Sequence, residues 1–81
     1  MLNLMRDIMN DELMIKRLRG LREDYDYTQQ HIADVLGTSQ TMYARYERGA
    51  NELPIRHLIT LCKFYKISSD YILGLSKIKH K

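Results

Sequence analysis

A short stretch of the chain carries side chains of the types that read the edges of DNA bases. An amide, a hydroxyl, a small methyl group and a guanidinium recur at helical spacing, so a helix presents them on one face. A Gln amide can pair with adenine in two places, Arg can do the same with guanine, and a Thr methyl can contact the thymine methyl. The residues of this face that are expected to touch base edges are Gln40, Thr41, Ala44 and Arg45.

Two short helices are needed to hold this face in place, and glycines mark their ends. The pattern predicts one helix that runs to Leu36 and stops at Gly37, and another over residues 40–48 that stops at Gly49. Only three residues separate the two helices. Side-chain oxygens suited to capping stand just before each helix, at Thr28 and Ser39.

Three further helices follow from apolar residues that recur three and four positions apart. We expect one over residues 11–24, capped by Asn10 or Asp11, one that starts at Pro54 and has a broad, deeply buried apolar face, and a short one capped by Ser68 or Ser69 and stopped by Gly74. The inward positions are expected to be Met14, Leu18, Leu21, Ile32, Ala33, Leu36, Tyr43, Tyr46, Ile55, Leu58, Ile59, Leu61, Cys62 and Tyr65.

The chain has room for one small all-α domain. With 81 residues it can build one core, and strand-like alternation is nearly absent. We divide it into an N-terminal arm over residues 1–10, a five-helix domain over residues 11–74 and a basic C-terminal tail over residues 75–81. The apolar residues of the arm are expected either to fray or to contribute to a dimer contact.

Composition excludes several classes of protein. A net charge of +3 with 44% hydrophobic residues fits neither a disordered polyelectrolyte nor a membrane span, and no secretion signal is evident, so the expected location is the cytoplasm. A single cysteine, Cys62, rules out an internal disulfide and a cysteine-built zinc site. No metal or other cofactor is expected. His31, His57 and His80 lack the spacing of metal ligands and are expected at the surface, and most of the tyrosines are expected at the core with their hydroxyls outside.

Several motifs together resemble a known family. They are Leu21-Arg22, Thr28-Gln29, Ile32-Ala33, the turn at Gly37, Tyr46-Glu47 followed by Gly49, Leu53-Pro54 and the closing SSDYILG. In these features, residues 12–74 resemble the phage-repressor and Cro family of helix-turn-helix DNA-binding domains, also called the xenobiotic-response-element type. The resemblance implies the five-helix fold of lambda-repressor-like domains, with the helix-turn-helix in its second and third helices.

The resemblance also implies roles for individual residues. Gln40, at the start of the third helix, is expected in the major groove, with Gln29 at a phosphate group. Arg22 and Glu47 are expected to form an ion pair that orients the third helix without touching DNA. The remaining candidates for phosphate contacts are Arg48, Asn51 and Ser39.

The expected function is a sequence-specific transcriptional regulator that represses by binding double-stranded DNA. One small module makes few base contacts, so we expect a homodimer on a pseudo-palindrome with half-sites about 34 Å apart. Two alternatives stay open: an antitoxin that represses its own operon and has a protein partner, and a helical protein-interaction module that does not bind DNA. Catalysis is not expected, since no activated nucleophile, metal cluster or acid pair is evident.

Overall fold

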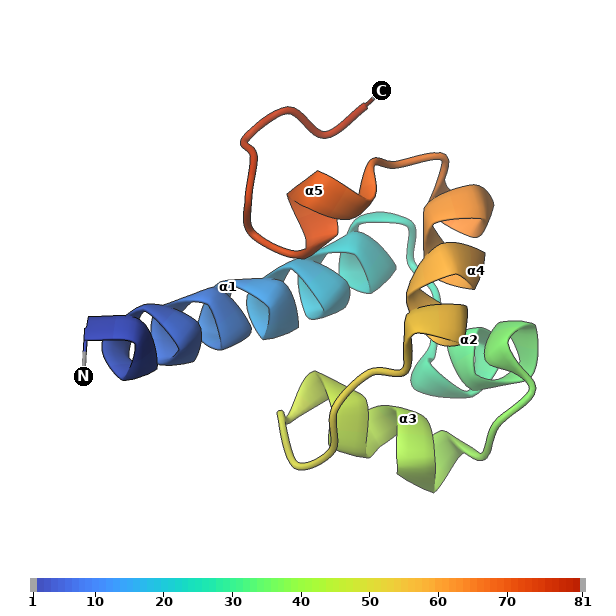
Figure 1. The fold of residues 1–81 in the computed structure, drawn as a ribbon. Helices are drawn as coiled ribbons and strands as arrows, with labels where there is room; N and C mark the ends of the chain where they lie inside the picture. The colour runs from blue at the N-terminus through green and yellow to red at the C-terminus, as the bar shows by residue number, and fades with distance from the viewer. Residues whose placement is uncertain (1, 81) are drawn as a thin grey trace.

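Five α-helices, and no strand among the described residues, make up the chain (Figure 1). The computed structural model describes the backbone of residues 2–80 and the side chains of residues 12–80. The helices confirm the all-α fold and the expected order of elements. They are α1 (Leu2–Asp24), α2 (Gln29–Leu36), α3 (Gln40–Glu47), α4 (Ile55–Tyr65) and α5 (Ser69–Ile72).

The first helix is longer than expected. It begins at Leu2 and not at Asp11, so the prediction of a cap at Asn10 or Asp11 was wrong. Residues 2–10 contain neither glycine nor proline, so nothing in their sequence breaks a helix that continues backward from the domain. The suggested dimer contact through residues 1–10 depends on side chains that lie outside the described residues.

The predicted caps of the short helices are present. The Thr28 and Ser39 hydroxyl oxygens each accept a backbone N–H three residues later, both at 3.0 Å. Ser68, one of the two candidates, caps α5 in the same way at 3.1 Å. Gly37 ends α2 with φ of 70°, a left-handed conformation that costs glycine little. These caps keep α2 and α3 short and fix the sharp turn between them.

The core lies where α1 crosses the other helices, with α5 above its C-terminal half and α2 and α3 below it in Figure 1. Most of the expected inward residues are buried there, including Tyr43 and Leu61 at 0% exposure. The hydrophobic core contains Leu18, Leu21, Ile32, Ala33, Leu36, Tyr43, Tyr46, Leu61, Tyr65, Ile67 and Ile72.

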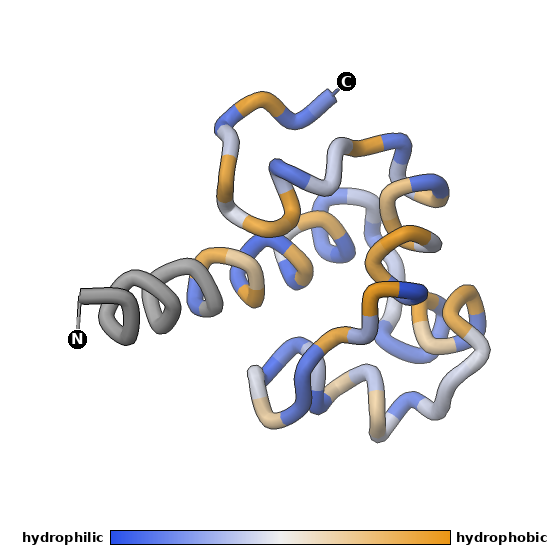
Figure 2. The backbone as a smooth tube through the Cα atoms, in the orientation of Figure 1, coloured by the Kyte–Doolittle hydropathy of each residue, from blue (hydrophilic) through white to orange (hydrophobic). Residues whose placement is uncertain are grey.

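The broad apolar face of α4 is only partly buried, which corrects the prediction. His57, Leu61 and Tyr65 form the buried stripe, at intervals of four residues. Ile55 and Ile59 stand two positions away from members of this stripe, on the opposite side of the helix, and are 74% and 49% exposed. Figure 2 shows hydrophobic positions recurring along the whole of α4. One flank of this helix is therefore apolar and uncovered.

Two predictions about side chains at the surface were also wrong. His57 is 6% exposed and lies edge-on to the ring of Tyr46, at 5.8 Å between ring centroids. The hydroxyls of Tyr43 and Tyr65 are buried and have no hydrogen-bond partner within the described part of the chain. In all three cases the ring fills space between helices, and the two tyrosine hydroxyls are buried together with their rings.

The burial of His57 predicts loss of stability in acid. Burial and the nearby Arg56 lower the pKa of His57 from its ordinary 6.5, because both disfavour the charged imidazolium. Folding therefore favours the neutral ring, so its contribution is complete above pH 6.5 and is lost as the pH falls below that value. We expect the melting temperature to fall between pH 7.5 and 5.5, and to fall less in His57→Gln. Equal slopes in the two proteins would contradict this assignment.

The described part of the C-terminal tail, residues 75–80, is hydrogen-bonded to the domain. The Ser68 N–H donates to the Lys79 carbonyl at 3.0 Å. Arg17 lies over the ring of Tyr71, at 4.1 Å from its centroid, and donates to the carbonyls of Tyr71 and Ser76. None of the described helices is both long and apolar enough to cross a lipid bilayer.

Candidate nucleic-acid interface

Helices α2 and α3 pack directly on each other across the three-residue turn. Ala33 is fully buried, and its small side chain lets the two helices approach closely. Tyr43 and Tyr46 anchor the inner side of α3 in the core. The opposite side of α3 is therefore held in a fixed position on the surface of the domain.

The outer face of α3 remains accessible. Thr41 and Arg48 are exposed, while Gln40, Ala44 and Arg45 are half-buried at the edge of the helix. None of the four candidate base-contacting residues lies in the core. Within residues 12–80, no group of His, Cys, Asp or Glu side chains has the arrangement of a metal site.

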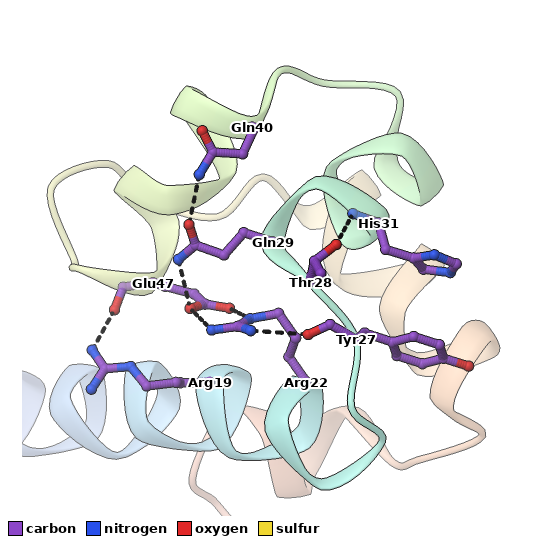
Figure 3. A network of polar contacts seen from close by, with 8 residues as sticks. All are labelled: Arg19, Arg22, Tyr27, Thr28, Gln29, His31, Gln40 and Glu47. Atoms are coloured by element: carbon purple, nitrogen blue, oxygen red, sulfur yellow. Dashed lines mark hydrogen bonds and ion pairs between the residues drawn. The ribbon is translucent and has the colours of Figure 1, made fainter.

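The predicted pair of Arg22 and Glu47 is present and joins α1 to α3 (Figure 3). The guanidinium donates to both carboxylate oxygens, at 2.7 Å from Nε and 3.0 Å from Nη2. A third bond runs from Arg22 to the Tyr27 carbonyl at 3.0 Å. The Glu47 side chain is 2% exposed and that of Arg22 15%, so this two-pronged pair is largely shielded from water.

The carboxylate of Glu47 stays ionised inside the domain. Burial by itself raises the pKa of the Glu47 carboxyl, but the hydrogen bonds from Arg22, the nearby Tyr43 hydroxyl and the hydrogen bond from Gln29 together outweigh burial, and the pKa lies below its ordinary value. Burial also raises the pKa of the Tyr43 hydroxyl, which is neutral at physiological pH. The charge of Glu47 is thus compensated by one arginine.

A chain of hydrogen bonds runs from the same carboxylate, through two side-chain amides, to the outer face of α3. Gln29 donates from Nε2 to Glu47 Oε1 at 3.1 Å, and Gln40 donates from Nε2 to Gln29 Oε1 at 2.7 Å (Figure 3). Each bond fixes which way the next amide is turned. Within the described part of the chain, the side-chain amide oxygen Oε1 of Gln40 accepts no hydrogen bond, so it remains available to a ligand.

A second link joins Arg45 to the loop after α3. Its Nε donates to Asn51 Oδ1 at 2.8 Å, and Asn51 Nδ2 lies 3.7 Å from the sulfur of Met42. The guanidinium is thereby aimed before any ligand arrives.

These links between side chains, including the contact of Met42 with Asn51, were not predicted from the sequence. The sequence held a partial signal for the contact between the two glutamines. Gln29 is the first residue of α2 and Gln40 is the first residue of α3, the two helices of the helix-turn-helix. The predicted residues fall into two connected groups, Gln29 with Gln40 and Arg45 with Asn51. Thr41, Ala44 and Arg48 complete the same face, and Ser39 caps α3 at its edge.

Comparison with known proteins identifies similar sequences and one similar structure. The family model described as helix-turn-helix matches residues 18–72. The uncharacterised HTH-type transcriptional regulator YobD of Bacillus subtilis (strain 168) is 36% identical over 61 residues, which are 75% of this chain and 54% of YobD. Antitoxin PezA of Streptococcus pneumoniae serotype 4 is 29% identical over 63 residues, 78% of this chain and 40% of PezA.

A solved structure has the same fold. The crystal structure of the P22 c2 repressor protein in complex with synthetic operator 9T in the presence of Tl+ superimposes with a TM-score of 0.71 and 28% sequence identity. The match covers 79% of this chain and 97% of the repressor chain. The chain spans about half the length of curated relatives that it matches.

Proposed function

We propose that this chain, which belongs to the helix-turn-helix family, binds double-stranded DNA in a sequence-specific way and regulates transcription as a repressor. The observation that carries the proposal is the outer face of α3, whose polar side chains are accessible and held in place by contacts behind them. Similarity to HTH-type transcriptional regulators and to a repressor crystallised with its operator supports the same role. In this proposal the chain acts by binding DNA, and α3 lies in the major groove.

The base contacts in this proposal come from the outer face of α3. Gln40 offers the amide pattern that adenine matches, and Arg45 offers the two donors that the O6 and N7 atoms of guanine accept. The braces behind these two side chains, at Gln29 and Asn51, reduce the conformational freedom lost on binding. Thr41 and Ala44 lie on the same helix and complete the proposed set of base contacts.

Phosphate contacts are proposed around this face. Gln29 stands at the N-terminus of α2, whose free backbone N–H groups attract an anion. Arg48 and Asn51 lie at the other end of the face, just past α3, and Ser39 lies at its start. Five basic residues and two acidic ones between positions 40 and 66 give this half of the domain a positive surplus.

The proposed binding unit is a homodimer on an inverted repeat. A single module of this size makes too few base contacts for useful discrimination, so two copies with half-sites about 34 Å apart are needed. The direct experiment is selection of bound duplexes from a random DNA pool. An inverted repeat among the recovered sequences supports the proposal, and recovery of no shared sequence contradicts it.

Binding to the selected duplex should weaken steeply with salt. Neutralised phosphates release counterions. The logarithm of the binding constant therefore falls linearly with the logarithm of the salt concentration, and the slope is proportional to the number of neutralised phosphates. Arg48 is the one cationic side chain in the proposed phosphate set, so we expect a slope of about −1 or steeper for each copy in titrations from 50 to 200 mM salt. A binding constant that does not change over this range would rule out phosphate docking.

A second candidate is an antitoxin that represses its own operon. The similarity to antitoxin PezA favours it, although the chain covers only 40% of that relative. The two candidates share the DNA-binding face and differ in whether a second protein binds elsewhere on the domain. Purification of the chain with the products of neighbouring genes distinguishes them.

A further inference from the structure

We propose that the uncovered apolar flank of α4 is a docking surface for an acidic amphipathic helix of a different protein. The inference goes beyond the proposed function, because it needs no DNA and none of the proposed DNA contacts lines this surface. We name the surface the α4–α5 groove and define it by its lining residues, which are Ile55, Leu58, Ile59, Cys62, Lys63, Ser69 and Leu73.

The groove is apolar and open to solvent. It has a volume of about 360 Å³ and lies between α4 and α5. Ile55 and Ile59, one helical turn apart, are 74% and 49% exposed along its edge. Isolated exposed hydrophobic residues are common, but a continuous row beside a groove of this size is typical of an interaction surface.

The spacing of the apolar residues on this side of α4 suits a partner helix. Four residues that line the groove follow one another at intervals of three and four positions along the helix: Ile55, Leu58, Ile59 and Cys62. Such a stripe accepts the apolar side of another amphipathic helix. Because α4 has 11 residues, it is about 16 Å long at 1.5 Å per residue, and a partner helix of about three turns covers the whole row.

The charges of α4 decide which kind of helix fits the groove. The helix and the residue that ends it carry no acidic residue and three exposed cations, Arg56, Lys63 and Lys66. Lys63 and Cys62 line both the groove and an adjoining hollow beside Lys66. The nearest acidic residues along the chain, Glu52 and Asp70, line neither of the two. Carboxylates on the flanks of a partner helix would therefore meet cations along α4.

Arg56 is the stronger indication of an acidic partner. It lies in the first turn of α4, where a cation opposes the helix dipole. Lys63 and Lys66 lie at the C-terminal end, where a cation stabilises the helix by itself. A carboxylate from a partner would compensate the unfavourable charge of Arg56.

The same charges argue against a second copy of this chain as the occupant. A two-fold axis brings the same face of both copies together, so the cations of α4 would meet only cations. A DNA backbone would compensate these charges but would leave Ile55 and Ile59 without an apolar partner. An acidic amphipathic helix meets both requirements, and pairing of two copies on DNA then uses another surface.

The test uses two designed peptides and no DNA. Each is a helix of about four turns, stapled on its outer side so that it is helical when free. Both carry leucines along one side, and the positions that flank the leucines are Glu in one peptide and Lys in the other. Anisotropy of the labelled peptides measures binding to the parent chain at low salt. We expect the Glu peptide to bind at least about tenfold more tightly than the Lys peptide.

Two pairs of variants locate the binding. Ile59→Glu should bind the Glu peptide at least about tenfold more weakly, since a carboxylate would be buried against leucines. Ile78→Glu should bind it as the parent does, because Ile78 is 71% exposed but does not line the groove. Lys63→Glu should favour the Lys peptide, whereas Lys77→Glu, at an exposed position of the tail, should keep the parent's preference. Thermal melting of Ile59→Glu should match the parent, because the residue is half exposed and Glu is a good helix former.

Three results would overturn the inference: neither peptide binds up to millimolar concentration, both peptides bind equally, or Ile59→Glu binds the Glu peptide as the parent does. Two further results would overturn it by identifying another occupant. One is a parent dimer in sedimentation equilibrium that Ile59→Glu abolishes, and the other is displacement of the Glu peptide by random duplex DNA.

The proposed function is judged separately, on the selected duplex. Ile59→Glu should bind this duplex as the parent does, and a loss of affinity there would assign the groove to DNA binding and contradict the inference. A chain that distinguishes the two peptides but selects no DNA would contradict the proposed function and leave the docking surface intact.

Discussion

Arg22→Ala is expected to lower the free energy of unfolding by about 3–5 kcal/mol, the range for breaking a buried ion pair by removing one partner. The reason is the position of Glu47, whose side chain is 2% exposed and keeps its charge through bonds from Arg22 and Gln29. Without the guanidinium, the carboxylate must remain charged inside the domain with one amide donor, or take up a proton. Urea unfolding at pH 7 measures the change.

Arg19→Ala is the matched control for this experiment. Arg19 is one turn away on the same helix and is exposed, and its one contact within residues 12–80 is a long one, 3.4 Å from Nη2 to the Glu47 backbone carbonyl. Its removal should cost about 0.5 kcal/mol or less, as for most surface changes. If the two variants unfold at the same urea concentration, the pair of Arg22 and Glu47 has no special structural role.

The second large effect concerns DNA. Arg45→Ala should weaken binding to the selected duplex by about 1–3 kcal/mol and remove the preference at one base pair, because a two-pronged contact to guanine is lost. Arg48→Ala should weaken binding to selected and random duplexes by the same factor, because a phosphate contact carries no sequence information. Competition binding with single-base substitutions in the duplex measures both.

Gln29→Ala is a third comparison in the same assay. A pure phosphate contact predicts equal weakening for all sequences, but Gln29 also holds Gln40 at 2.7 Å. We therefore expect general weakening together with a reduced preference at the base that Gln40 reads.

Loss of base preference in Arg48→Ala and none in Arg45→Ala would reverse the roles assigned to the two arginines.

Local signals made most of the fold predictable. Thr28, Ser39 and Gly37 determine where the short helices begin and end through bonds and dihedral angles within a few residues, and such signals can be read from one sequence. The pair of Arg22 and Glu47 came from resemblance to a family. Spacing alone does not reveal a contact between residues so far apart along the chain.

The failures concern burial and side-chain contacts. Apolar periodicity placed both Ile59 and Leu61 inside, whereas α4 buries only the stripe that α2 and α5 cover. His57 seemed polar enough for the surface, but its ring fills a space beside Tyr46. Which flank of a helix is covered depends on how the helices are arranged around it, and a single sequence does not specify that arrangement directly.

In the proposed complex, the hydrogen bond between Gln29 and Gln40 would tie recognition of one base to attachment at the neighbouring DNA phosphate. When the base opposite Gln40 offers the wrong pattern, its amide must turn, and the bond to Gln29 is strained or lost. An unfavourable base pair at that position then also weakens the proposed contact between Gln29 and the adjoining phosphate. A mutated operator should consequently lose more affinity there than one missing contact accounts for, and part of that loss should disappear at high ionic strength.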